Sequence, residues 1–291
     1  MNQALKDQRV QELISLYNNG DVKECLLRAK KVAKIYPEEP FVFNLIGVVS
    51  ASIGSYEEAI ESYKRALKIN PNYFEVYNNL GVALNDSKKP KDAISYLRKA
   101  LKINPHYPEA YNNLGNALKE IESLDQAIES YENAIKLNPK FIDPYTNLAI
   151  VFASKKNENE KAEYYFKKAL EISPENSEAL KYFSDFLVSI QRYSEAKALL
   201  EKCLILVPRN PDVLNLLGQV YKSENFEKAL EFYKNALYLS EDKESIQNNI
   251  GALYFEFNKV KSAISYFKKI SHSDSNTKSL LNLAYAYIAD N

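Results

Sequence analysis

Asparagine recurs in this 291-residue chain in one fixed local context, directly before a Leu-Gly-like pair. The asparagines in this context are Asn79, Asn113, Asn147, Asn249 and Asn282. A carboxamide carries one acceptor oxygen and two N–H donors. Such a side chain can pair with both the N–H and the C=O of a second backbone. A regular row of such side chains could bind an extended backbone whatever side chains that backbone carries.

Residues suited to catalysis or metal binding are few and widely separated. His106 and His272 are the only histidines, and neither has cysteine or carboxylates at metal-ligand spacing. Cys25 and Cys203 stand where similar segments of the chain hold alanine, which predicts buried, inert thiols. Seven glycines leave little room for a phosphate-binding loop. The sequence predicts no catalytic residue, no metal site and no cofactor, and we expect that the protein is not an enzyme.

The asparagines are placed by a repeat of about 34 residues. The segment Tyr77–Leu84 returns almost letter for letter at Tyr111–Leu118. One small residue recurs in the same register along the chain, at Gly47, Gly81, Gly115, Ala149, Ser184, Gly218, Gly251 and Ala284. A fixed period of this size is typical of a stacked array of small units. We therefore expect an elongated array and not a globule.

Each unit is predicted to be a pair of helices. In the third unit, apolar residues at helical spacing predict helix A over 108–121 and helix B over 124–137. Pro108 suits a helix start, and Pro139 prevents continuation of the preceding helix. No segment alternates with a period of two, so the fold class is predicted to be all-α. The small residues let the two helices approach closely. The tyrosines Tyr63, Tyr77, Tyr111, Tyr131, Tyr145 and Tyr233 are predicted to fill the space between units.

The repeat runs nearly end to end, so one domain over 1–291 is predicted. Its expected parts are a degenerate unit over 5–39, repeats over 40–73, 74–107, 108–141, 142–176, 177–210, 211–243 and 244–276, and a partial repeat over 277–291.

The aromatic, Leu-Gly, Ala, aromatic, Ala and Pro positions at fixed offsets resemble the tetratricopeptide repeat family. The resemblance covers nearly the whole chain. It implies a right-handed superhelical solenoid of stacked antiparallel helix pairs, with helix A lining a concave groove and helix B forming the convex back. Members of this family mostly bind other proteins or extended peptides and carry no chemistry of their own.

The resemblance places an asparagine-rich row in the concave groove. The predicted peptide-binding residues are Asn78, Asn79, Asn112, Asn113, Asn116, Asn147, Asn249 and Asn282. The row resembles the asparagine ladder in the superhelical arm of O-GlcNAc transferases. The alternative is that asparagine here reflects family ancestry alone. Tyr182 and Leu216 interrupt the row, which argues against one continuous track.

Charged residues near the same groove have simpler interpretations. An acidic residue recurs at the start of helix A, at Glu75, Glu109, Asp143, Glu178 and Asp212. These carboxylates stabilise a helix N-terminus or form an acidic strip for basic ligands. The lysines Lys119, Lys181 and Lys222 lie in separate units beside acidic residues, so they do not reproduce the carboxylate clamp found in some family members.

Composition limits the classes of partner. Lysine plus arginine equals aspartate plus glutamate at 38 each, which removes the electrostatic case for nucleic acid. No apolar run approaches the roughly 20 residues of a membrane span, so no membrane insertion is expected. Two distant cysteines indicate that disulfides are not used, and a cytoplasmic location is predicted.

The last predicted helix, over 280–289, is an apolar helix A without a helix B behind it. Either the chain is part of a longer protein, or this edge self-associates or docks onto a partner. The leading functional prediction is a non-catalytic scaffold that binds a protein or extended peptide. The alternative is the substrate-recruiting arm of a larger transferase with its catalytic domain after Asn291.

Overall fold

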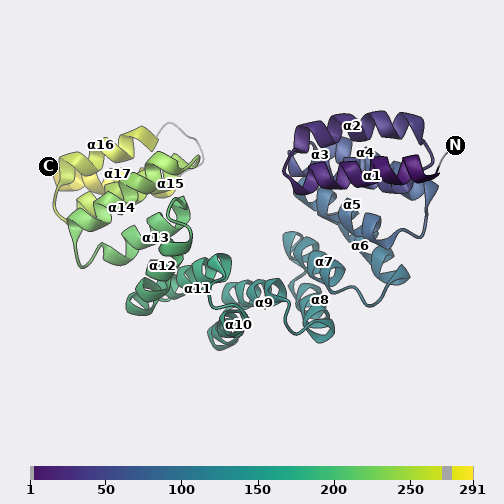
Figure 1. Cartoon of the computed structure of the whole chain (residues 1–291). Helices are drawn as coiled ribbons and strands as arrows, with labels where there is room; N and C mark the ends of the chain where they lie inside the picture. Colours follow the sequence, from purple (N-terminus) through teal and green to yellow (C-terminus); the bar gives the residue numbers. More distant parts are fainter. Residues whose placement is uncertain (1–2, 271–276, 291) are drawn as a thin grey trace. The chain divides into compact units, whose positions relative to one another are not determined.

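The computed structural model describes residues 3–270 and 277–290, and these residues form seventeen helices and no strand (Figure 1). The all-α prediction is confirmed. The helices are α1 Gln3–Asn18, α2 Val22–Ile35, α3 Pro40–Ser52, α4 Tyr56–Ile69, α5 Phe74–Asp86, α6 Pro90–Ile103, α7 Pro108–Glu120, α8 Leu124–Leu137, α9 Ile142–Ser154, α10 Asn159–Ile172, α11 Ser177–Ser189, α12 Tyr193–Leu206, α13 Pro211–Tyr221, α14 Phe226–Leu239, α15 Lys243–Glu256, α16 Val260–Ile270 and α17 Thr277–Asp290.

The helices follow one another in pairs, from α1 and α2 to α15 and α16, with α17 after them. In the third repeat, α7 ends one residue before the predicted boundary and α8 matches its prediction. Helix α7 begins with Pro108. The first N–H groups of a helix have no acceptor within the helix, so the N–H that proline lacks costs no hydrogen bond. Helix α11 begins with a side-chain cap instead: Asn176 Oδ1 accepts a hydrogen bond from Ala179 N at 2.8 Å.

Size complementarity holds the two helices of a pair together. A Cβ atom added to Gly115 would lie 2.4 Å from Cε1 of Tyr131, so the ring rests on the glycine backbone. The same contact joins Gly47 to Tyr63, Gly81 to Leu97, Gly218 to Tyr233 and Gly251 to Phe267. Tyr63, Tyr131 and Tyr233 were predicted to fill the space between units, but these contacts place their rings within the pair. Only a residue without a side chain lets helix A come this close.

The first pair reverses this arrangement. Leu13 stands 34 residues before Gly47, and Ala29 stands 34 residues before Tyr63. Leu13 is 1% exposed and Ala29 is fully buried, so the large side chain comes from α1 and the small one from α2. The pair keeps its packing although its sequence is degenerate.

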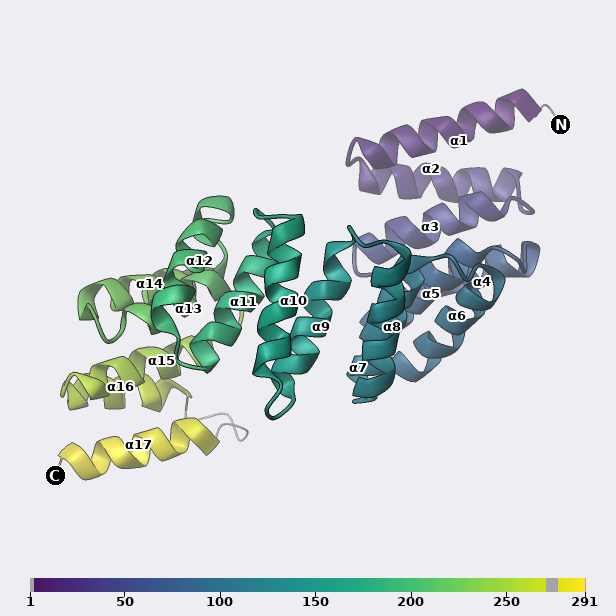
Figure 2. The ribbon, with the colours of Figure 1, turned by 90° about the horizontal axis from the view of Figure 1, so that it is seen from below.

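The chain divides into two compact units, Met1–Val151 and Phe152–Asn291, and the division falls within α9. Within each unit, successive helices pack on one another. In the first unit the A helices α3, α5 and α7 are also neighbours, and in the second unit α11 packs on α13 and α15 on α17 (Figure 2). The A helices of each unit therefore present a shared face. Among the described residues, no helix is both long and apolar enough to cross a bilayer.

Candidate functional site

The predicted asparagines form hydrogen bonds between successive A helices. In each bond the side-chain Nδ2 of the asparagine before the Leu-Gly-like pair donates to the Oδ1 of an asparagine in the preceding A helix. The bonds run from Asn79 to Asn44 at 3.1 Å, Asn113 to Asn78 at 2.9 Å, Asn147 to Asn112 at 3.0 Å, Asn249 to Asn215 at 2.9 Å and Asn282 to Asn248 at 3.0 Å. We call these five contacts the asparagine pairs.

The acceptors differ in burial: Asn78, Asn112 and Asn248 are buried, whereas Asn44 and Asn215 are only partly buried. The acceptors Asn78 and Asn112 are 6% and 5% exposed, so they support the neighbouring helix instead of facing a ligand. The donors Asn113 and Asn147 are only partly buried. A carboxamide has two donors and an oxygen with two lone pairs. Because the pair uses one donor, each outer carboxamide is held in place with hydrogen-bonding capacity remaining.

Asn116 has a different role from the paired asparagines. Its Oδ1 accepts a hydrogen bond from the buried Tyr131 hydroxyl at 2.8 Å. Burial raises the pKa of Tyr131, so the hydroxyl stays protonated and donates this bond. Asn116 therefore helps to fix the ring that packs on Gly115.

The acceptor asparagines were missed by the sequence analysis in three of the five pairs. Asn44, Asn215 and Asn248 lie 34 or 35 residues before their donors. The sequence therefore contains a signal for these acceptors: an asparagine stands about one repeat before each predicted donor.

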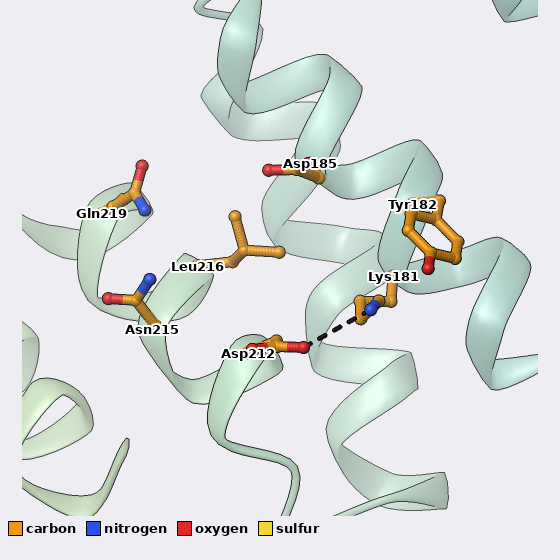
Figure 3. A pocket seen from close by; sticks show the side chains of 7 residues that line it. All are labelled: Lys181, Tyr182, Asp185, Asp212, Asn215, Leu216 and Gln219. Carbon is orange, nitrogen blue, oxygen red and sulfur yellow. Dashed lines mark hydrogen bonds and ion pairs between the residues drawn. The ribbon is translucent and has the colours of Figure 1, made fainter. Parts of the chain in front are cut away.

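A pocket lies where the asparagine pairs are interrupted, between α11 and α13 of the second unit. Figure 3 shows side chains from both helices bordering it. Its volume is about 220 Å³, and it is lined by Lys181, Tyr182, Asp185, Asp212, Asn215, Leu216 and Gln219. Tyr182 and Leu216, the two predicted interruptions, are both part of this lining.

The charges in this pocket partly compensate one another. Lys181 Nζ lies 3.4 Å from Asp212 Oδ2 and 4.2 Å from the centroid of the Tyr182 ring. Burial raises the pKa of Asp185, with a smaller contribution from Asp212 and an opposing one from Lys181. One cation thus faces two carboxylates, and the pocket has a negative balance.

The other residues considered for chemistry stay apart. Cys25 and Cys203 are buried, as predicted, and burial raises the pKa of both thiols. Lys222 pairs with Glu256 at 3.0 Å, so two of the three groove lysines already have carboxylate partners. His106 is exposed, and His272 lies outside the described residues. Within residues 3–270 and 277–290, no cluster of histidine, cysteine or carboxylates could hold a metal ion.

Models of known protein families match the repeat. A TPR repeat model matches residues 47–88, and tetratricopeptide repeat models match 74–107, 108–141, 153–220 and 213–247. These matches span well over half of the chain. The chain belongs to the tetratricopeptide repeat family. Its resemblance to the arm of O-GlcNAc transferases remains a separate prediction.

Individual proteins are similar to this chain over different lengths. A protein named CTR9 homolog from Arabidopsis thaliana is 31% identical over 111 residues, which cover 36% of this chain and 10% of that protein. The crystal structure of MamA is 31% identical with a TM-score of 0.50, covering 55% of this chain and 93% of that one. This chain therefore spans a small part of its curated relative.

Two further structures show the fold alone. The Cut9-Hcn1 hetero-tetramer of the APC/C contains a chain with a TM-score of 0.73 and 18% identity, covering 98% of this chain and 57% of that one. A tetratricopeptide repeat protein from Parabacteroides merdae has a TM-score of 0.63 and 17% identity, covering 85% and 98%. Stacked helix pairs are thus the fold of this chain.

Proposed function

We propose that this tetratricopeptide repeat chain is a non-catalytic interaction module that binds an extended polypeptide along the shared face of its A helices. The observation that carries the proposal is the set of asparagine pairs. In the first unit the outer carboxamides belong to Asn79, Asn113 and Asn147, and in the second to Asn249 and Asn282. The acceptor asparagines hold these side chains before a ligand arrives, which lowers the entropy lost on binding.

The expected affinity is modest. A hydrogen bond contributes about 0.5–1.5 kcal/mol net, so three carboxamides in one unit supply only a few kcal/mol. Ordering a flexible peptide offsets part of this gain. We therefore expect broad recognition of extended backbone and weak preference for sequence.

The pocket between α11 and α13 adds a place where a ligand side chain can be selected. Tyr182 and Leu216 offer apolar surface, while Asp185 and Asp212 add negative charge beside Lys181. This combination favours a long side chain with an apolar stem. Selection there would complement the sequence-tolerant asparagines.

The triple variant Asn79→Ala, Asn113→Ala and Asn147→Ala tests the proposal. Its expected result is weaker binding of a panel of fluorescein-labelled unstructured peptides, measured by anisotropy, with helicity retained by circular dichroism. Asn70, Asn104 and Asn138 provide a matched control, because each accepts a backbone N–H at 3.1 Å from outside the A-helix face. Equal binding by the two triple variants would contradict the proposal.

A second proposal concerns self-association through α17. Leu281, Tyr285 and Ile288 are 54%, 55% and 73% exposed on this helix. An apolar surface of this kind favours contact with a second copy. Mass that rises with concentration in light scattering, and falls back in Ile288→Glu, is the expected result. A concentration-independent monomer would contradict it.

The transferase-arm alternative depends on sequence after Asn291. It makes the same prediction for the A-helix face, since a recruiting arm also binds extended substrate. Reading the coding sequence beyond Asn291 distinguishes the two proposals: a transferase domain there favours the recruiting arm.

A further inference from the structure

We propose that a second binding site lies in a groove over α2, α3 and α4, which takes a large aliphatic or aromatic side chain from an acidic polypeptide segment. The groove has a volume of about 650 Å³ and an apolar floor that includes Ala33, Phe43 and Ile46. It is separate from the asparagine pairs, because most of its lining comes from the B helices α2 and α4. We call it the α2–α4 groove.

The floor of the groove exists because one large side chain is missing. The position of Ala33 holds a larger apolar residue in the following pairs, at Leu67, Leu101, Ile135, Leu170, Leu204 and Leu237. Leu67 is 9% exposed in the next pair and the other five are partly buried, so a side chain at this position packs at least in part on its neighbours. Ala33 leaves that space open beside Phe43 and Ile46 of the floor. An incoming leucine or phenylalanine can supply the missing apolar surface.

The rim of the groove is positively charged. Lys30, Lys31, Lys34 and Arg65 line it, against the carboxylates Glu58 and Glu61. Lys30 Nζ pairs with Glu58 Oε1 at 2.5 Å, which compensates one of the four cations.

Arg65 is fixed at one side of the rim. Its guanidinium pairs with Glu38 at 3.1 Å and lies 5.7 Å from the centroid of the Phe43 ring. Lys31 and Lys34 have no carboxylate partner in the part of the chain that the structure describes. Charge complementarity therefore favours a ligand with carboxylates beside its apolar side chain.

The shape of the site favours a polypeptide over a membrane surface. A recess beside Ala33 accepts one inserted side chain, whereas a bilayer meets only projecting groups such as Leu27, which is 50% exposed. An acidic segment with one large apolar residue can place that residue on the apolar floor and its carboxylates beside the cations of the rim. An anionic membrane would satisfy the rim alone.

The test uses the full chain and three labelled peptides of equal length. The first has a central leucine flanked by aspartate and glutamate, the second replaces the leucine with serine, and the third replaces the acids with lysine. Vesicles of phosphatidylcholine and phosphatidylserine serve as the membrane probe. Anisotropy measures peptide binding, and cosedimentation measures vesicle binding.

The decisive variant is Ala33→Leu, which fills the recess with the residue that most other pairs carry. Burying a leucine-sized group accounts for about a tenfold change in affinity or more, so the variant is expected to lose at least that much for the first peptide. The double variant Lys31→Glu and Lys34→Glu tests the rim, and it remains informative if Ala33→Leu folds poorly. Lys68→Glu is its matched control, because Lys68 stands 34 residues after Lys34 on α4.

The expected pattern is tight preference for the first peptide, loss in both groove variants and no change in Lys68→Glu. The site is disproved if the wild-type chain binds none of the peptides, or if Ala33→Leu binds the first peptide as well as wild type does. Vesicle binding that is unaffected by Ala33→Leu would show a membrane surface instead. The triple asparagine variant should keep this binding, so this site and the A-helix face can fail independently.

Discussion

At the scale of single residues, asparagine has two roles that depend on burial. Asn112 is almost fully buried and accepts from Asn147, whereas Asn147 itself is partly exposed. A buried carboxamide without its partner would leave polar groups unsatisfied. This explains why the donor and the acceptor asparagine are lost together. Where Leu216 stands in place of the donor, Lys181 stands in place of the acceptor one repeat earlier.

Removing the buried member should therefore reduce stability. Asn112→Ala leaves the Asn147 donor without its acceptor, at an expected cost of about 1–3 kcal/mol. Urea unfolding of the single variants and the double variant with Asn147→Ala measures the coupling. The double variant should be less destabilised than the sum of the two single variants. Strict additivity would mean that the 3.0 Å contact contributes nothing.

The sequence predicts the donors of the asparagine pairs but not the pairing. A repeat period tells which residues share a row, and this was enough to find Asn79, Asn113 and Asn147. It does not tell which neighbouring rows approach within hydrogen-bonding distance. The α2–α4 groove was missed for a related reason, because a recess arises from an absent side chain at Ala33.

At the scale of elements, the turn between helices A and B holds a left-handed residue in every described pair except α13 and α14. Gly20 and Gly54 supply it in the first two pairs, with φ of +80° and +77°. Later pairs use larger residues in the same conformation, among them Lys88 at 62° and Glu122 at 60°. Left-handed backbone disfavours residues with a Cβ, so these turns store strain.

Glu122→Gly is expected to stabilise the chain. Relief of left-handed strain is worth about 1–2 kcal/mol, and the added freedom of glycine in the unfolded chain offsets about 0.5–1 kcal/mol. A gain of about 0.5–1 kcal/mol should appear in urea unfolding. Gly54→Ala is the reverse control, since no atom lies within 4 Å of its added Cβ and only the conformation is tested. Stabilisation by both changes would contradict the argument.

An ion pair joins α10 to the start of α12 in the second unit. Arg192 Nη2 donates to Glu163 Oε1 at 3.2 Å, and Lys167 Nζ lies 2.7 Å from the same oxygen. Hydrogen bonds from Arg192 and then Lys167 lower the pKa of Glu163 to about 2. The folded state thus binds this proton more weakly than the unfolded state does.

Glu163→Gln should lose stability in a pH-dependent manner. Because the folded pKa is depressed, the contribution is complete above the ordinary value of 4.5 and is lost as pH falls toward about 2. At pH 7 the expected loss is about 0.5–1 kcal/mol, as for a well-made exposed pair. Urea unfolding at pH 7 and pH 3.5 should show a smaller difference between wild type and variant at the lower pH. A difference that grows with acidity would contradict the assignment.

At the scale of the whole molecule, successive helices pack on their neighbours within two compact units. The sequence predicts the helix pairs, because small residues and prolines recur with the period, and in the third repeat it predicts the helix bounds to within one residue. It does not predict the division within α9, since the same period continues through it. That division depends on how densely residues contact one another, which no single repeat encodes.

This organisation predicts that a packing defect stays local. In Gly115→Ala the new Cβ would lie 2.4 Å from the ring of Tyr131, which is fully buried and bonded to Asn116. The ring cannot swing away, so the expected cost is about 1–3 kcal/mol. Because stability in repeat proteins is a sum of units and nearest-neighbour contacts, the loss should appear in α7, α8 and the adjoining pair.

Amide hydrogen exchange measures where the loss falls. Faster exchange is expected in α5 to α8, with unchanged rates in α13 to α16 of the other unit. The reverse experiment uses Gly218→Ala, whose added Cβ would lie 2.5 Å from the ring of Tyr233, and it should affect α13 and α14 while sparing α5 to α8. If either variant accelerates exchange equally in all helices, the chain unfolds as one cooperative body. Reciprocal local effects would instead show that each unit holds its own stability, as expected if each carries its own binding face.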